Sequence, residues 1–324
     1  MNRTDLALAA MATTMREAFV DTVTEALDRD PRLAVVTADI SSAAFEPARR
    51  RHPRRVINVG IREQAMVGVA GGLALTGLRP VVHSYAPFLV ERPFEQIKLD
   101  LGHQEVGAVL VSIGGSYDDP VWGRTHQAPG DVALIDSLPG WTVHVPGHPA
   151  EVAALLRAAL SGDDRVYVRL SARTNSAARP AGTGLVRVRD GSAGVVVAVG
   201  PTLDPVLTAV AGLDVSVGYL STVRPFDAVG LRNMVSRLHC ATGAVSTGAV
   251  STGIVLVEPY LRGTSAHEVS QALRDTPHRL LALGVRRDHE LHGYGTAADH
   301  DAHHGLDAAG LGRSIRGFMA RRPG

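Results

Sequence analysis

The sequence predicts an α/β protein built from two consecutive doubly wound domains, each with a mainly parallel sheet. Short apolar runs alternate with amphipathic helical stretches along the chain, which is the pattern of repeated βαβ units. The chain has 324 residues, of which 45% are hydrophobic, and this is enough for two separate cores. A stretch rich in Ala, Pro, Gly, Ser and charged residues interrupts the alternation. We therefore expect domains at 12–175 and 194–324, joined by a linker at 176–193.

The first domain is expected to begin with a helix at 13–27. Thr14 and Glu17 have the spacing of a capping box at its start, and its apolar residues recur on one face. Apolar runs then predict the strands 32–40, 55–60, 79–85, 106–114, 141–147 and 165–173. Helical stretches follow several of these strands, namely one that starts near Glu63 and those at 91–103 and 148–160.

A long glycine-rich loop, 114–131, separates two of these strands. Loops of this length inside a compact domain are usually functional. Its sequence contains Trp122 and His126, and we treat it as part of a candidate site.

The same alternation resumes in the second domain. Strands are predicted at 194–200, 214–220, 253–259 and 279–285, with helices at 203–212, 226–238 and 265–274. The doubled sequence GAVSTGAVSTG at 243–253 is too short for a solenoid repeat and indicates a loop insertion.

The segment 286–307 is rich in histidine and aspartate. Its histidines lack a clean helical pair or a closed tetrahedral set, so we expect a solvated loop before the last helix and no metal site in this chain. The histidines in question are His289, His292, His300, His303 and His304.

Charge and composition exclude several functional classes. The chain has 33 Lys and Arg against 32 Asp and Glu, and this balance argues against a nucleic-acid partner. A single cysteine, Cys240, excludes a disulfide framework and suits a reducing compartment. No apolar run approaches the ~20 residues that cross a bilayer, and the N-terminus lacks the layout of a signal peptide. We expect a cytoplasmic protein without a membrane partner.

The stretch RVINVGIREQAMVGVAGGLAL, residues 55–75, places Glu63 between a strand and a glycine-rich helix. Its glycines do not form G-x-G-x-x-G, so a dinucleotide site is not indicated, and close helix packing explains them better. By position alone, Glu63 is a helix N-terminal carboxylate stabilised by the helix dipole.

Several motifs in order resemble one family. Residues 57–82, INVGIREQAMVGVAGGLALTGLRPVV, resemble the pyrimidine-binding domain of the transketolase and deoxyxylulose-phosphate synthase family of thiamine diphosphate enzymes. SYAPFLVERPFEQIKLD and GRTHQ resemble later segments of that domain, and TVRPFD and VLVEPYLRGTSAHEVSQAL resemble the family's C-terminal domain. The resemblance covers nearly the whole chain, and it implies a pyrimidine-binding domain followed by a transketolase C-terminal-like domain.

The resemblance implies a cofactor site for thiamine diphosphate. Glu63 corresponds to the carboxyl group that hydrogen-bonds the pyrimidine N1′ and promotes the imino form of the cofactor. Phe88 corresponds to the ring on which the pyrimidine stacks, with Tyr85, Arg92 and Ile61 also at the cofactor. Core packing of the aromatic residues and an exposed ion pair of Arg92 are the alternatives.

Substrate residues are implied in the same way. His126 corresponds to a histidine that meets substrate hydroxyl or phosphate groups and assists proton transfer; a solvated loop histidine is the alternative. Arg169 or Arg173 corresponds to a substrate-phosphate arginine, with Arg173 slightly preferred.

The loop departs from the family pattern at one position. Many relatives have an aspartate directly before Gly-x-Thr-His, where this chain has Trp122. Asp118 or Asp119 could replace that carboxylate only if the loop folds back, so the loop sequence does not predict a standard sugar-phosphate substrate.

The family's Gly-Asp-Gly motif, which holds the diphosphate through a metal ion, is absent from this sequence. We therefore expect an N-terminal-type diphosphate-binding subunit as partner, supplying Mg²⁺ or Ca²⁺, in a dimer of heterodimers. The expected reaction is transfer of a two-carbon ketol unit from a ketose, a sugar or sugar phosphate, to an aldehyde. The alternatives are an acyl- or glycolyl-transferring or 2-oxo-acid-decarboxylating subunit, and a non-catalytic assembly partner.

Overall fold

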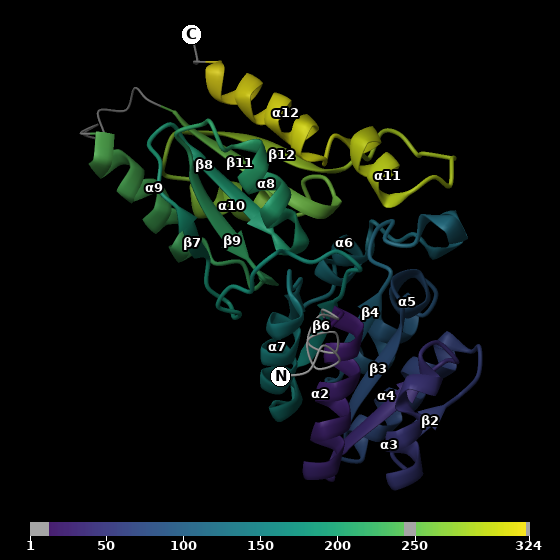
Figure 1. Ribbon diagram of the computed structural model, residues 1–324. Coiled ribbons are helices and arrows are strands. Elements are labelled where there is room, and N and C mark those ends of the chain that lie inside the picture. Colours follow the sequence, from purple (N-terminus) through teal and green to yellow (C-terminus); the bar gives the residue numbers. More distant parts are fainter. Residues whose placement is uncertain (1–12, 243–250, 322–324) are drawn as a thin grey trace, which may run out of the picture.

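The computed structural model describes residues 13–242 and 251–321, which form two mainly parallel sheets flanked by helices (Figure 1). The larger sheet has seven strands in the order β10-β5-β6-β4-β3-β1-β2. Its strands are β1 (Leu33–Thr37), β2 (Val56–Asn58), β3 (Arg79–Tyr85), β4 (Val109–Ile113), β5 (Trp141–His144), β6 (Arg165–Arg169) and β10 (Thr222–Arg224). Only β10 runs antiparallel to its neighbour among these strands. The predicted α/β fold class is confirmed.

Helices cover both faces of this sheet. Alternate residues of one strand point to opposite faces, so Val35 packs in the core with α2 (Met15–Arg29) and α7 (Pro149–Ser161). Its neighbour Val36 packs in the core with α4 (Glu63–Leu75). The remaining helical segments of this half are η1 (Ser42–Phe45), α3 (Glu46–Arg51), η2 (Pro87–Glu91), α5 (Phe94–Gln96), η3 (Ile97–His103), η4 (Pro120–Trp122), η5 (Arg124–His126) and α6 (Asp131–Asp136).

The smaller sheet has five strands in the order β12-β11-β8-β9-β7. Its strands are β7 (Val186–Arg189), β8 (Val195–Val199), β9 (Ser216–Leu220), β11 (Thr252–Leu261) and β12 (His278–Val285). Its helical segments are η6 (Gly200–Thr202), α8 (Leu203–Ala209), α9 (Ala228–Thr242), α10 (Ala266–Ala272), α11 (Ala297–His304) and α12 (Ala308–Ala320). Helices α8 and α12 pack together, as do α9 and α10, and Figure 1 shows α12 running along one side of this sheet.

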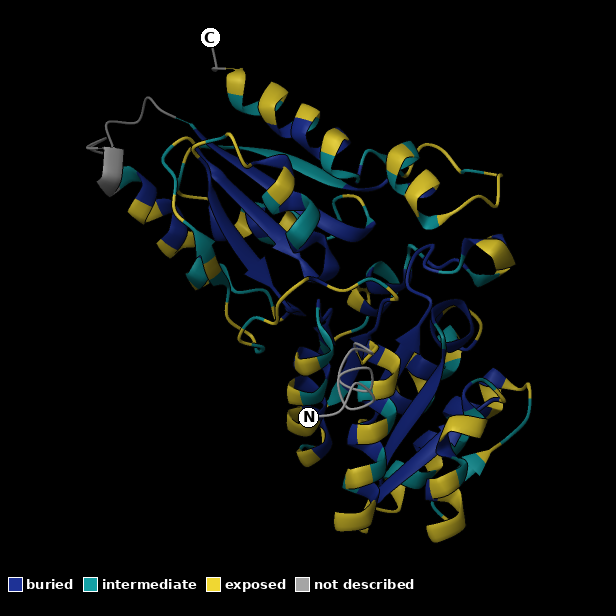
Figure 2. Cartoon of the chain, viewed as in Figure 1, coloured by how far each residue is buried: buried dark blue, intermediate teal, exposed yellow. Residues whose placement is uncertain are grey.

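The two halves share one core. Val143 of β5 and Val145 after it belong to the same buried cluster as Val199, Leu220 and Val223 from the second half. Strand β10 also crosses over and pairs antiparallel with β5 of the larger sheet. Figure 2 shows the buried strands of both sheets inside helices whose outer faces are exposed.

Several local predictions are confirmed. Thr14 and Glu17 form a complete capping box at the start of α2. The strand predicted at 79–85 has the same bounds as β3. The helix predicted at 91–103 is present but begins earlier, at Pro87, and much of it has π-helical hydrogen bonding.

Other predictions differ from the structure. The segment 176–193, predicted as a linker, contains β7, whose Val-Arg-Val-Arg sequence alternates in the manner of an edge strand. The domain limits themselves stay a prediction. The solvated loop predicted at 286–307 contains helix α11, and His300 within it is buried, so that prediction is wrong for α11.

Most of the doubled GAVSTG sequence lies outside the described residues. No helix among residues 13–242 and 251–321 is long and apolar enough to cross a membrane.

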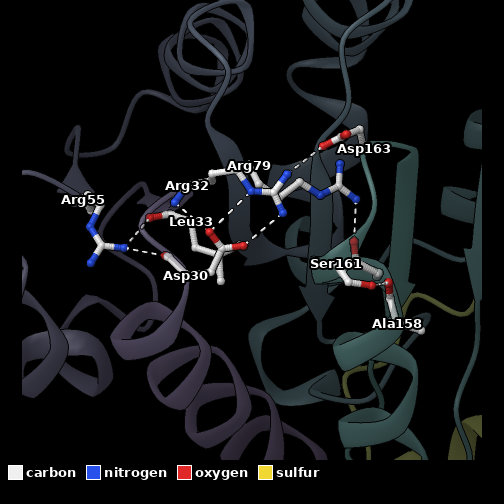
Figure 3. A network of polar contacts seen from close by, with 9 residues as sticks. Asp30, Arg32, Leu33, Arg55, Arg79, Ala158, Ser161 and Asp163 are labelled. Atoms are coloured by element: carbon white, nitrogen blue, oxygen red, sulfur yellow. Dashed lines mark hydrogen bonds and ion pairs between the residues drawn. The ribbon is translucent and has the colours of Figure 1, made fainter.

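The amino ends of the central strands are closed by arginines (Figure 3). Arg79, at the start of β3, is buried and donates to the backbone oxygens of Asp164 and Ala159 at 2.6 and 2.7 Å. Arg55 donates to the carbonyls of Asp30 and Leu33. Because this end is occupied by internal polar contacts, the carboxyl ends of the strands are the open edge, where α/β sheets usually carry their sites.

Candidate functional site

The turn after β2 brings Glu63 to the carboxyl edge of the larger sheet. Asn58 ends β2, and its side-chain oxygen accepts hydrogen bonds from the backbone N–H groups of Asp39 and Gly60, both at 3.0 Å. Gly60 has φ +70°, a left-handed conformation that glycine adopts without strain. The turn ends with Glu63 as the first residue of α4, where the helix dipole favours a carboxylate.

Glu63 is a buried carboxylate with a half-exposed partner. The residue is 5% exposed, and its Oε1 accepts a hydrogen bond from Arg92 Nη1 at 2.7 Å. The Arg92 side chain is 44% exposed. Its guanidinium also lies over the Phe88 ring, with Cζ 3.8 Å from the ring centroid. One planar cationic group therefore stacks on Phe88 and donates to Glu63 at the same time.

Aromatic side chains gather beside this pair. The His126 ring lies edge-on to Phe88 and to Tyr85, with centroid distances of 4.9 and 5.4 Å. Trp122 lies 5.7 Å from His126 and is 62% exposed. Phe88 comes from the π-helical segment η2, a type of segment that is frequent at functional sites. The structure thus brings together Glu63, Phe88 and His126 from three separate motifs.

A cavity of about 580 Å³ opens next to Tyr85. Asp119 and the start of α2, including Thr14 and Arg16, line it. Burial and the nearby Asp119 raise the pKa of Tyr85, so its hydroxyl stays protonated and can donate a hydrogen bond. The sequence motifs did not predict that Arg16 lines this cavity. The only sequence feature near it was the capping box of Thr14 and Glu17, which marks where α2 begins.

Asp118 does not fold back to replace the family aspartate. Its carboxylate points inward and accepts hydrogen bonds from Ser171 Oγ at 3.0 Å and from the Ala172 N–H at 2.9 Å. Burial raises the pKa of this carboxyl group. Asp119, the other candidate, lies beside Tyr85 at the cavity, while Trp122 is the residue directly before Gly123.

The two candidate arginines have other partners. Arg169 is buried and forms an ion pair with Asp131 at 2.7 Å, while its Nη2 donates to Ser116 Oγ at 2.6 Å. Arg173 donates to Asp301 Oδ1 at 2.8 Å, on the side that faces α11. Arg169 is thus an interior residue in this structure, and Arg173 is the more accessible of the two.

Two further observations bound the site. Ile61 lies in the turn before Glu63 and is 72% exposed, so it borders the site from outside. In the part of the chain that the structure describes, no group of three or more His, Cys, Asp or Glu side chains is arranged to hold a metal ion.

Comparison with known proteins gives a consistent family. Residues 11–176 match the family described as "Transketolase, pyrimidine binding domain". A protein of Rhodococcoides fascians, described as "Uncharacterized 33.6 kDa protein in fasciation locus", is 54% identical over 308 residues, 95% of each chain. The "6-deoxy-6-sulfo-D-fructose transketolase subunit SqwH" of Clostridium sp. is 30% identical over 242 residues, 71% of this chain and 74% of that one.

Longer relatives and solved structures agree with this. A "1-deoxy-D-xylulose-5-phosphate synthase" of Alkalilimnicola ehrlichii is 32% identical over 92% of this chain, which spans 46% of that enzyme. The fold matches the solved structure of a "Split gene transketolase, inactive beta4 tetramer" with a TM-score of 0.77 at 23% identity, over 96% of this chain and 100% of that one.

Proposed function

The chain belongs to the transketolase pyrimidine-binding domain family, and from this membership we propose that it is one subunit of a two-chain, thiamine diphosphate-dependent transketolase-like enzyme. The enzyme transfers a two-carbon ketol unit from a ketose to an aldehyde acceptor. This chain contributes the pyrimidine side of the active site, centred on Glu63.

The arrangement of Glu63, Arg92 and Phe88 carries this proposal. An aminopyrimidine needs an aromatic face to stack on and a carboxyl group at its ring nitrogen. In this structure a planar N–H donor, the Arg92 guanidinium, already makes both contacts, at 3.8 Å to Phe88 and 2.7 Å to Glu63. The residues therefore fit the pyrimidine, and Arg92, whose side chain is half exposed, can withdraw into solvent to admit it.

When bound, thiamine diphosphate would supply a nucleophilic carbon for ketol transfer. Glu63 would form the hydrogen bond to the pyrimidine nitrogen, and its low exposure would strengthen that bond. Phe88 orients the ring. His126, in ring contact with Phe88 and Tyr85, donates and accepts protons at the substrate oxygens.

A partner chain supplies the other half of the site. The sequence contains no Gly-Asp-Gly motif for the metal-bound diphosphate. The relative from Clostridium is named as a transketolase subunit, and one from Actinobacillus succinogenes, 27% identical, is named as a subunit of an apulose-4-phosphate transketolase. We propose a diphosphate-binding partner that carries Mg²⁺ or Ca²⁺, assembled with this chain as a dimer of heterodimers.

A second reaction is favoured by the loop. Trp122 stands directly before Gly123, where many relatives have a carboxylate; Asp118 faces inward, and Asp119 lies beside Tyr85. A donor without a hydroxyl group at that position, such as a 2-oxo acid, fits this difference. Product analysis with a ketose phosphate and with pyruvate, using the assembled enzyme, separates the two reactions.

The test of the proposal is Glu63→Gln in the complex of this chain with a Gly-Asp-Gly-containing partner. We expect turnover to fall by at least about 100-fold, the usual size of a general acid–base contribution. Glu46→Gln is the matched control, because Glu46 is also the first residue of a helix and pairs with arginines, Arg49 and Arg50, and it should retain turnover within about twofold. If Glu63→Gln keeps more than about a tenth of the turnover, the chain is a non-catalytic partner and the proposal fails.

A further inference from the structure

Loop 114–130, which carries Trp122 and His126, is held by the second half of the chain. We propose that the segment 286–304 positions this loop, and that Tyr117 is the positioning residue through which it acts. The consequence for turnover rests on the proposed function of His126; the structural part does not.

Both ends of the loop are fixed on strand β11. Ser116 Oγ donates to the Pro259 carbonyl at 2.5 Å, and the Leu261 N–H donates to the Pro129 carbonyl at 2.8 Å. Between these anchors the loop leaves β11, and a cleft of about 430 Å³ separates part of it from segment 286–304. The position of the middle of the loop therefore depends on other contacts.

Tyr117 makes the central contact. It is buried, and its hydroxyl donates to Asp301 Oδ1 of α11 at 2.7 Å. Its ring stacks on His300 and His304, with centroid distances of 4.9 and 5.4 Å and interplanar angles of 23° and 29°. Tyr117 of the loop thus contacts helix α11 through one hydrogen bond and two ring contacts.

Asp301 also joins the loop to the strand behind it. Arg173, which follows β6, donates to the same Asp301 oxygen at 2.8 Å, and its guanidinium lies 5.4 Å from the Tyr117 ring centroid. Because one carboxylate accepts from both residues, a movement of α11 affects both.

The tip of the loop has its own contacts with the segment. Arg124 pairs with Glu290 at 3.2 Å. Tyr294 lies against Gly123 so closely that a Cβ on this glycine would come 2.1 Å from the Tyr294 ring. The Tyr294 carbonyl accepts a hydrogen bond from His300 Nε2 at 2.9 Å, which links the tip contacts to α11. Segment 286–304 therefore contacts the loop at Gly123 and Arg124, between Trp122 and His126, and adds to the contacts that His126 makes with Phe88 and Tyr85.

Hydrogen–deuterium exchange of the full chain tests this directly. Amides of Trp122, Gly123 and His126 make hydrogen bonds within the loop and report its order. Tyr117→Phe removes the bond to Asp301 but keeps the ring, and Asp301→Asn changes the acceptor without touching the loop. We expect exchange in a peptide covering 117–127 to become at least about tenfold faster in both variants, the effect of losing one hydrogen bond to a charged group.

Tyr219→Phe is the matched control. Tyr219 is also buried and donates its hydroxyl to a carboxylate, that of Glu151 in α7, so Tyr219→Phe removes no hydrogen bond of the loop. If the exchange of 117–127 in Tyr117→Phe and Asp301→Asn is no faster than in Tyr219→Phe, the proposal is overturned.

The assembled enzyme separates the structural claim from the claim about turnover. We expect Tyr117→Phe to lower kcat about tenfold with little change in KM, while Tyr219→Phe leaves kcat unchanged. Faster exchange with unchanged kcat supports the positioning and refutes the role given to His126.

Discussion

The ion pair between Asp131 and Arg169 gives the sharpest prediction, because it decides whether Arg169 acts on a substrate or holds the interior together. Neither side chain is more than 1% exposed, and the Arg169 Nε to Asp131 Oδ2 distance is 2.7 Å. The same carboxylate accepts from the Tyr167 hydroxyl at 2.7 Å and from the Val132 N–H at 2.9 Å. Asp131→Ala removes all of these acceptors and leaves the buried guanidinium without its ion-pair partner.

The expected cost follows from that burial. Breaking a buried ion pair by removing one partner destabilises a protein by about 3–5 kcal/mol, a large share of the ~5–15 kcal/mol that holds a typical chain folded. Asp163→Ala is the control, because Asp163 pairs with Arg32 at 3.4 Å and both side chains are exposed. That pair contributes about 0–1 kcal/mol.

Urea unfolding followed by circular dichroism measures both variants. The double variant Asp131→Ala, Arg169→Met should recover part of the loss, because it removes the unpaired charge as well. If Asp131→Ala lies within about 1 kcal/mol of Asp163→Ala, the interior role of Arg169 is refuted. A raised KM for a phosphorylated substrate in Arg169→Met, without a loss of stability, would restore the substrate role.

Two further predictions concern stability. His83 is fully buried, its ring is hydrogen-bonded to the Val111 carbonyl and to Ser41, and burial lowers its pKa to about 4. The neutral ring therefore contributes its full stability above about pH 6.5, and this contribution is lost as the pH falls towards 4. The midpoint of urea unfolding should thus depend less on pH between pH 7 and pH 5 in His83→Asn than in the unmodified chain, and an equal dependence contradicts this. Gly71 and Gly72 of α4 form a matched pair: a Cβ at Gly71 would meet the Asp100 carbonyl oxygen at 2.6 Å, whereas one at Gly72 has nothing within 4 Å. Gly71→Ala should lower the free energy of unfolding of the isolated chain by about 1–3 kcal/mol, and Gly72→Ala should raise it by about 0.5–1 kcal/mol. A lower stability of Gly72→Ala would contradict the open space that the structure shows at Gly72.

Features with a local signature could be predicted from the sequence. The capping box of Thr14 and Glu17 located α2, and the apolar run at 79–85 located β3. Helix α11 had the same kind of signature, since Thr296 and Asp299 form a capping box, but the density of histidines and aspartates around it suggested a loop instead.

Features that depend on distant partners could not be predicted in this way. Arg169 and Arg173 are both arginines at the end of one strand, and their difference arises from Asp131 and Asp301, which lie far away in the sequence. Likewise, nothing near Arg92 indicates that its guanidinium covers Phe88 and bonds to Glu63. The family resemblance implied the grouping of Glu63, Phe88 and His126. In the structure each of them follows a strand whose carboxyl end lies at the same sheet edge.

Strand β10 has a practical consequence for dissecting the protein. The family match ends at residue 176, and a fragment cut there would keep β5 while losing its antiparallel neighbour β10. Such a fragment would expose an unpaired sheet edge together with Val143 and Val145, and exposed edges of this kind invite aggregation. A cut after Arg224 would in turn leave β8 without its neighbour β11. The two halves are therefore better expected to unfold as one cooperative unit than as independent modules.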